Sequence, residues 1–158
     1  MKSLLPLLFT CITLYSCAQQ NDQFIGVRGG FGSGVTYQHY LDPSRAIEVI
    51  AYSRWQGLSM TGLYQFHKPL FDVEGMKWYY GAGAHAGFFR YREDGPRWHD
   101  EEWDGTRVVI GADAILGLEY FFDELPLQFS LDWKPAINVI GHSGFWGDEG
   151  AFSIRYSF

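Results

Sequence analysis

Cysteine is scarce in this chain, and both cysteines, Cys11 and Cys17, lie within the first eighteen residues. A mature domain that begins after Ala18 contains none, which excludes a disulfide-stapled secreted domain for that product. Charged residues are also few, at 19% against about a quarter in ordinary soluble domains. The net charge is −6 and no basic cluster is present. Nucleic-acid binding depends on such a cluster, so no nucleic-acid partner is expected.

A long hydrophobic run is missing as well. The apolar stretch Leu4–Tyr15 is too short for a membrane-spanning helix, which needs about 20 apolar residues. Lys2 precedes it and Ser16-Cys17-Ala18 follows it, which predicts a cleaved signal peptide over residues 1–18. The segment Leu14–Cys17 also resembles a lipobox, in which an acylated Cys17 would become the mature N-terminus. Either route predicts export, with one domain over residues 19–158.

Aromatic residues and glycine are abundant, and apolar and polar residues alternate with a period of two. Aromatic residues make up 18% of the chain and glycines number 19, a mixture that favours strands and turns. The clearest alternation runs from Leu127 to Ile140, where one face is apolar and the other mostly polar. The same pattern recurs over the segments 46–55, 58–68, 78–91, 108–122 and 151–158. Six strands are therefore expected from Ala46 onward.

The stretch Phe24–Leu41 alternates too, and it reads either as one long strand or as two short ones. A closed bacterial barrel needs an even number of strands. One long strand would give seven and leave an unpaired edge, which lipid does not tolerate. We therefore expect a turn at Gly32-Ser33-Gly34 that pairs Phe31 with Val35, and eight strands altogether.

The connections between the expected strands are of two kinds. Tight turns are predicted at 42–45 and 123–126, with a slightly longer turn at 70–75. The long connections are 92–107 and 141–150. If the last strand runs down to the periplasm, both long connections lie on the outer side and these turns on the inner side. That asymmetry is the one known for outer-membrane barrels.

The polarity of the two faces decides between a soluble and a membrane barrel. An eight-stranded barrel has an interior just wide enough for side chains to fill, and the apolar stripe is too aromatic to pack there. The polar stripe carries both signs of charge and can neutralise itself when enclosed. The sequence therefore predicts an all-β fold, a closed antiparallel up-and-down transmembrane barrel of eight strands, whose outward rings form two interfacial belts.

The enclosed charges are expected to pair with one another and to plug the lumen, so that no open pore remains. His67 and His85 are expected to bond to Glu119 or Asp113 rather than to a metal. The predicted lumen ion-pair network consists of Arg28, Glu48, Arg54, Asp113, Glu119, Asp132, Lys134 and Arg155. The predicted inner belt consists of Phe66, Trp78, Tyr80, Tyr120, Phe122, Phe129, Tyr156 and Phe158, and the outer belt of Phe31, Trp55 and Phe88.

Several motifs carry a resemblance to a known family. They are Gly26-Val27-Arg28-Gly29-Gly30, Gly62-Leu63-Tyr64, Trp78–His85, Leu131–Pro135 and Tyr156-Ser157-Phe158. With them the mature chain resembles the small outer-membrane barrels of the OmpX/OmpA/OmpW-like superfamily, especially those from Bacteroidota. The resemblance implies a barrel in the outer membrane of a Gram-negative bacterium, in contact with outer-membrane lipid, and it implies almost nothing about chemistry.

The last strand also resembles the C-terminal strand that the barrel-assembly machinery reads in its substrates. It alternates apolar and polar residues and stops at a terminal phenylalanine. The resemblance makes its apolar residues the expected assembly signal: Phe152, Ile154, Tyr156 and Phe158.

Candidate chemistry is confined to the long connections. His142 and Ser143 with Asp148 and Glu149 are residue types of a hydrolase, but their spacing differs from the strand-borne His-x-Ser and distant Glu of the lipid A deacylase pattern. The run His99–Glu102 with Asp104 could hold a divalent cation, yet it reads more simply as a charged outer loop balanced by three arginines, Arg92, Arg97 and Arg107.

No catalytic residue, metal or cofactor is therefore predicted. The favoured function is a non-enzymatic barrel that acts structurally or presents its outer connections to an unidentified partner. The alternatives are a lipid A-modifying enzyme and a soluble lipocalin-like carrier of an apolar ligand.

Overall fold

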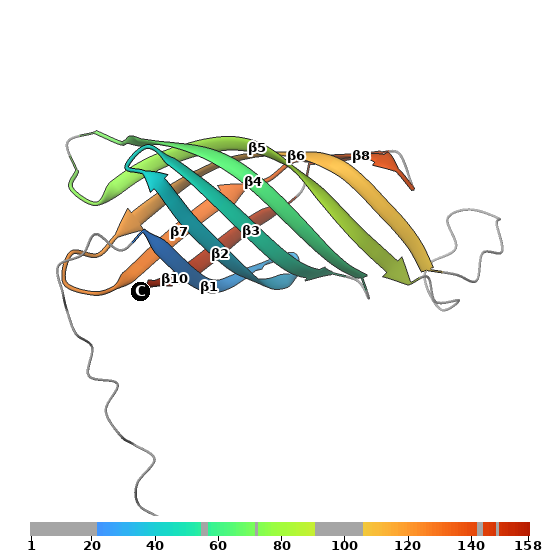
Figure 1. Ribbon diagram of the computed structural model, residues 1–158, viewed down its shortest axis with the longest axis horizontal. Coiled ribbons are helices and arrows are strands. Elements are labelled where there is room, and N and C mark those ends of the chain that lie inside the picture. The colour runs from blue at the N-terminus through green and yellow to red at the C-terminus, as the bar shows by residue number, and fades with distance from the viewer. Residues whose placement is uncertain (1–21, 55–56, 72, 91–105, 142–143, 148) are drawn as a thin grey trace, which may run out of the picture.

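The computed structural model describes residues 22–54, 57–71, 73–90, 106–141, 144–147 and 149–158, and its regular elements there are all strands (Figure 1). None of these residues forms a helix long and apolar enough to cross a bilayer. The strands are β1 (Gln23–Gly30), β2 (Ser33–Asp42), β3 (Arg45–Arg54), β4 (Gly57–Pro69), β5 (Met76–Arg90), β6 (Thr106–Phe121), β7 (Leu127–Trp133), β8 (Ala136–Ile140), β9 (Gly144–Trp146) and β10 (Gly150–Ser157).

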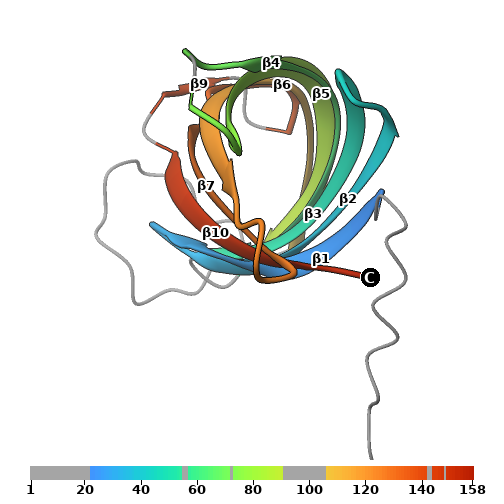
Figure 2. The same cartoon turned by 90° about the vertical axis from the view of Figure 1, so that its left-hand side faces the viewer.

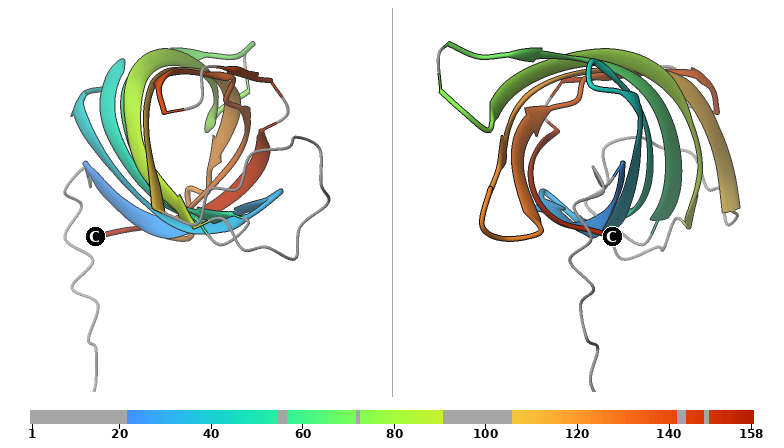
Figure 3. Two further views of the ribbon diagram at one scale, coloured as in Figure 1. Left: turned by 90° about the vertical axis from the view of Figure 1, so that its right-hand side faces the viewer. Right: turned by 60° about the vertical axis from the view of Figure 1, so that its left-hand side comes forward.

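The strands close into a barrel, which Figure 2 and the left panel of Figure 3 show from its two ends. Each of β1 to β6 pairs antiparallel with the next, and β6, β7, β10 and β1 complete the ring. Pro135 has no N–H to donate and interrupts the ladder between β7 and β8. The pairing with β6 nevertheless continues, because the Ala114 N–H donates to the Pro135 carbonyl at 2.9 Å. With β7 and β8 counted as one strand, and β9 as a short flanking strand of β8, the predicted up-and-down barrel of eight strands is confirmed.

The N-terminal stretch forms two strands, but the turn lies two residues earlier than expected. Val27 pairs with Val35, and the Gly30 N–H donates to the Gly32 carbonyl at 2.9 Å around Phe31. The predicted pairing of Phe31 with Val35 is therefore wrong. Gly34 belongs to the ladder, where a Cβ would lie 2.3 Å from the Ala51 carbonyl oxygen. Because the register differs by an even number of residues, each side chain keeps its predicted face.

The two ends of the barrel differ, as Figure 1 shows. One end, here called the turn end, carries the connections at 43–44, 70–75 and 122–126 together with Asp22 and Phe158. The other, the loop end, carries the connection at 31–32 and the strand ends that flank residues 55–56, 91–105 and 141–149. Both long connections thus start and finish at the same end, opposite the turns at 43–44, 70–75 and 122–126, which is the predicted arrangement.

Polarity is inverted relative to a soluble protein. On β3, Glu48 is fully buried inside the barrel, whereas its neighbours Ile47 and Val49 are exposed on the outside. The outward rings contact one another near the turn end: Phe66 stacks on Tyr80 at 5.5 Å between ring centroids, and Tyr80 on Trp78 at 5.3 Å. At the loop end Phe31 and Phe88 are exposed, and the predicted belt residue Trp55 lies outside the described residues.

Two apolar clusters also occupy the interior. Phe24, Tyr40 and Ala46 pack with Phe121 just inside the turn end. A second cluster lines the wall formed by β3 to β6 and consists of Ile50, Tyr52, Leu63, Tyr79 and Ile115. Strand periodicity places these side chains inward. The sequence predicted ion pairs in the interior and did not identify these residues as an apolar core.

Candidate functional site: the polar interior

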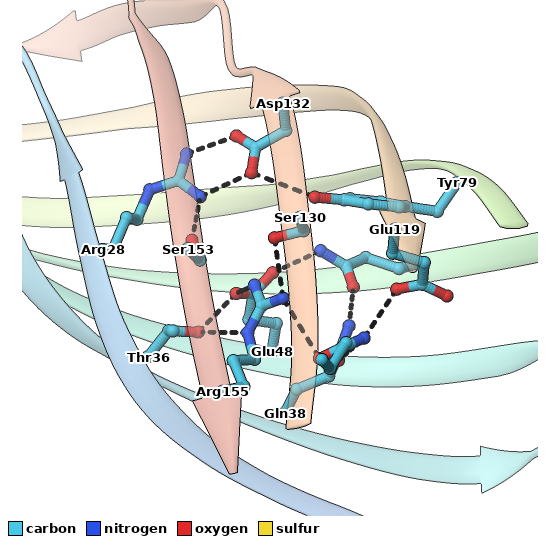
Figure 4. A network of polar contacts seen from close by, with 12 residues as sticks. Arg28, Thr36, Gln38, Glu48, Tyr79, Glu119, Ser130, Asp132, Ser153 and Arg155 are labelled. Atoms are coloured by element: carbon cyan, nitrogen blue, oxygen red, sulfur yellow. Dashed lines mark hydrogen bonds and ion pairs between the residues drawn. The ribbon is translucent and has the colours of Figure 1, made fainter. Parts of the chain in front are cut away.

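The barrel interior holds charged and amide side chains from many strands, and in the described residues they form a polar network of three hydrogen-bonded groups. Figure 4 shows the two groups that contain Arg28 and Arg155. Tilted strands bring together residues that are far apart in sequence. We describe the network from the loop end towards the turn end.

Asp113 on β6 is the acceptor of the cluster nearest the loop end. The Lys134 ammonium lies 2.8 Å from one of its oxygens, and His85 Nδ1 lies 2.7 Å from the other. An ionised carboxylate only accepts hydrogen bonds, so the His85 Nδ1–H donates. Lys134 also pairs with Glu149 at 3.1 Å, and His85 Nε2 lies 2.9 Å from Asn138 Oδ1.

Arg28 and Asp132 form the next pair, and both side chains are inaccessible to solvent. The guanidinium contacts both carboxylate oxygens, with one nitrogen at 2.7 Å, which is the bidentate geometry of strong arginine–carboxylate pairs. The Tyr79 hydroxyl donates to the same carboxylate at 2.9 Å. Gly117 makes room for this ring, since a Cβ there would lie 2.5 Å from Tyr79 Cζ.

Glu48 and Arg155 form the central pair, and neither is exposed. Their side chains are in direct contact, and the Thr36 hydroxyl and the Gln65 amide also donate to the Glu48 carboxylate. The Arg155 guanidinium donates as well to Ser130 Oγ at 2.9 Å. The central pair is therefore tied into hydrogen bonds from β2, β4 and β7, which is what makes it costly to break.

Amide side chains connect the central pair to Glu119 near the turn end. Gln38 donates to Gln65 at 2.9 Å, and Gln128 donates both to Gln38 at 3.1 Å and to Glu119 at 2.8 Å. The other Glu119 oxygen accepts from the Tyr40 hydroxyl at 2.7 Å and lies 2.7 Å from His67 Nδ1. The basic side chain that contacts Glu119 is thus a histidine rather than a lysine or an arginine.

Arg54 was predicted to join the lumen network. The structure places it at the loop end of β3, half-buried, with its guanidinium carbon 5.5 Å from the centroid of the Phe31 ring. The expected histidine contacts are present as His67 with Glu119 and His85 with Asp113. Sequence reasoning missed Gln38, Gln128 and Tyr79 as members of the network. Their inward phase was the only available signal.

The apolar residues of the expected assembly signal are exposed, three of them on β10 and the fourth directly after it: Phe152, Ile154, Tyr156 and Phe158. β10 joins β7 to β1, so it closes the ring. Recognition by an assembly machinery stays a prediction.

The candidate chemistry of the loops is largely outside the described residues, which do not include His142, Ser143, Asp148 or the segment 91–105. Glu149 is described, and it pairs with Lys134. Within the described part of the chain, no three His, Cys, Asp or Glu side chains gather as a metal site. The interior groups bond mainly to each other, an arrangement suited to stability.

A closed eight-stranded antiparallel barrel with a charged interior and an apolar exterior has the architecture of an outer-membrane barrel protein. The structure is similar to the crystal structure of the N-terminal β-barrel domain of Pseudomonas aeruginosa OprF, with a TM-score of 0.68 and 16% sequence identity over 88% of this chain and 98% of that chain. No family model and no curated protein matches the sequence. At this identity the likeness establishes the fold.

Proposed function

We propose that this chain is an integral outer-membrane protein of a Gram-negative bacterium whose barrel anchors it and whose lumen is closed by ion pairs. The observation that carries the proposal is the inverted polarity: Arg28, Glu48 and Arg155 are buried while Val27, Met60 and Leu131 are each about 60% exposed. Soluble monomers rarely expose apolar patches above a few hundred Å². Lipid removes that cost, and a closed barrel satisfies its backbone groups within the sheet.

The motifs quoted above support a place among the small OmpX/OmpA/OmpW-like barrels, with Bacteroidota as the source. In this role the barrel acts structurally, or it presents the connections 91–105 and 141–149 to a partner outside the cell. A lipocalin-like carrier is disfavoured because Arg28, Glu48 and Arg155 fill the middle of the barrel, where a carrier would hold its apolar ligand.

Fractionation tests the membrane assignment. The chain should remain in the outer-membrane fraction after alkaline or urea washing, require detergent for release, and migrate differently on a gel with and without boiling. A soluble carrier would be released without detergent.

Mass spectrometry of lipid A from cells with and without the protein should show identical species, and a new or missing lipid A species would support the enzyme instead.

The closed lumen predicts the electrical behaviour of the purified barrel. Arg155 on β10 with Glu48 on β3, and Tyr40 on β2 with Glu119 on β6, join well-separated strands of the ring. We expect these contacts across the lumen to block a continuous water path for ions. In planar bilayers the folded protein should show no large, stable conductance. Long-lived openings of porin size would contradict the plugged interior.

Assembly provides a separate prediction, which concerns Phe158. If the machinery reads the apolar side of β10, Phe158→Ala should reduce the amount of folded, heat-modifiable protein in the outer membrane. Ser157→Ala, which leaves that side unchanged, is the matched control. Equal insertion of the two variants would count against an assembly role for Phe158.

A further inference from the structure

The outer surface of the barrel carries a groove that membrane anchoring alone does not require. It lies over β5, β6 and β7 near the turn end and has a volume of about 470 Å³, which falls in the range of small-molecule sites, roughly 300–1,000 Å³. Its walls are outward-facing apolar side chains, chiefly Trp78, Leu116, Leu118, Leu131 and Trp133.

The strand register gives the groove its shape. Trp78 pairs with Leu118, and Leu118 with Leu131, so these three residues form one row across the strands. Leu116 pairs with Trp133 in the next row. The two tryptophans therefore stand at opposite corners, with leucines between them. An apolar groove lined by leucines and tryptophans suits an alkyl chain.

A positive charge lies beside the turn-end wall of the groove. The Lys68 ammonium is 5.7 Å from the centroid of the Trp78 ring and 5.8 Å from that of Tyr80. Among the described residues no carboxylate pairs with Lys68, whereas Arg45 at the same end is paired with Asp42. An exposed lysine next to interfacial aromatic rings is positioned to meet a lipid phosphate.

We infer that the groove binds one acyl chain of an anionic phospholipid whose headgroup phosphate lies at Lys68. The inference rests on the proposed membrane location and adds a lipid class and a position to it. Charge and shape act together: the groove between Trp78 and Trp133 holds the chain, and its Trp78 end brings the headgroup to the ammonium.

Quenching of tryptophan fluorescence by brominated lipids tests this site. The barrel is folded into phosphatidylcholine vesicles, in a background that keeps Trp78 and Trp133 and replaces the other tryptophans by phenylalanine. Brominated phosphatidylglycerol and brominated phosphatidylcholine are then compared as quenchers. We expect a preference for the anionic lipid of roughly fivefold, the size expected for one lysine at an anionic surface.

Two test variants, each with a control, distinguish the contribution of the Lys68 charge from that of the apolar groove. Lys68→Gln should reduce the preference to about one, while Lys77→Gln should keep it, because the Lys77 ammonium lies over Phe121 and Tyr40 in the barrel mouth. Leu131→Phe should reduce it by filling the groove.

The remaining control for groove filling is Leu58→Phe, at an exposed position on β4, which should keep the preference. Equal quenching by both lipids, or a preference that survives Lys68→Gln or Leu131→Phe, would overturn the site while leaving the membrane assignment intact. Absence of quenching by either lipid would instead overturn the membrane assignment and the site with it.

Discussion

Replacing Arg155 by methionine should lower the free energy of unfolding of the barrel by about 3–5 kcal/mol, the cost of removing one partner from a buried ion pair. Glu48 would then lose its directly paired cation in a place with no access to water. The Thr36 and Gln65 contacts to its carboxylate remain, but hydrogen bonds from neutral groups do not replace the lost cation. The measurement is urea unfolding of the folded barrel in phospholipid vesicles, followed by loss of the heat-modifiable band.

The double variant Glu48→Met/Arg155→Met should lose less stability than the sum of the two single variants, because it removes both charges from the interior. Arg45→Ala is the matched control for loss of an arginine. The Arg45–Asp42 pair lies at the surface, where ion pairs contribute little, so this variant should unfold close to the parent. Equal losses in Arg155→Met and Arg45→Ala would contradict a stabilising role for the buried network.

Placing a charge on the outward face should also destabilise the barrel strongly. Val27 lies in the middle of β1 between Ile154 on one neighbouring strand and Val35 on the other, and it is 61% exposed. In a bilayer, Val27→Arg should cost about 2–4 kcal/mol, the value for arginine on the lipid-facing side near the midplane. Val27→Leu at the same position should leave stability nearly unchanged.

This substitution discriminates between a membrane barrel and a soluble one. In water an arginine at an exposed strand position is tolerated, and it would improve solubility by covering apolar surface. Unfolding of both variants in vesicles, together with their yield of folded protein from the outer membrane, gives the comparison. A Val27→Arg variant as stable as Val27→Leu would mean that this face contacts water.

The alternation over Leu127–Ile140 was enough to predict which residues of that segment share a face, because strand side chains alternate whatever their partners are. The number of strands was also predictable, because a closed bacterial barrel needs an even number of them. The place of the N-terminal turn was mispredicted because Gly34 was taken as a turn residue, whereas its missing side chain serves the close approach to Ala51. Glycine occurs both in turns and at strand positions where two backbones approach closely, and the residue type alone does not show which of the two applies.

Taken alone, the sequence determined which side chains are enclosed and which face outward, since charges of both signs alternate with apolar residues along each strand. Only the tertiary structure decided which enclosed charge meets which. Arg28 on β1 meets Asp132 on β7, past the intervening strand β10, and His67 on β4 meets Glu119 on β6, past β5. These pairings depend on how far the strands are staggered when the sheet closes, and that stagger is a property of the whole ring rather than of any one segment.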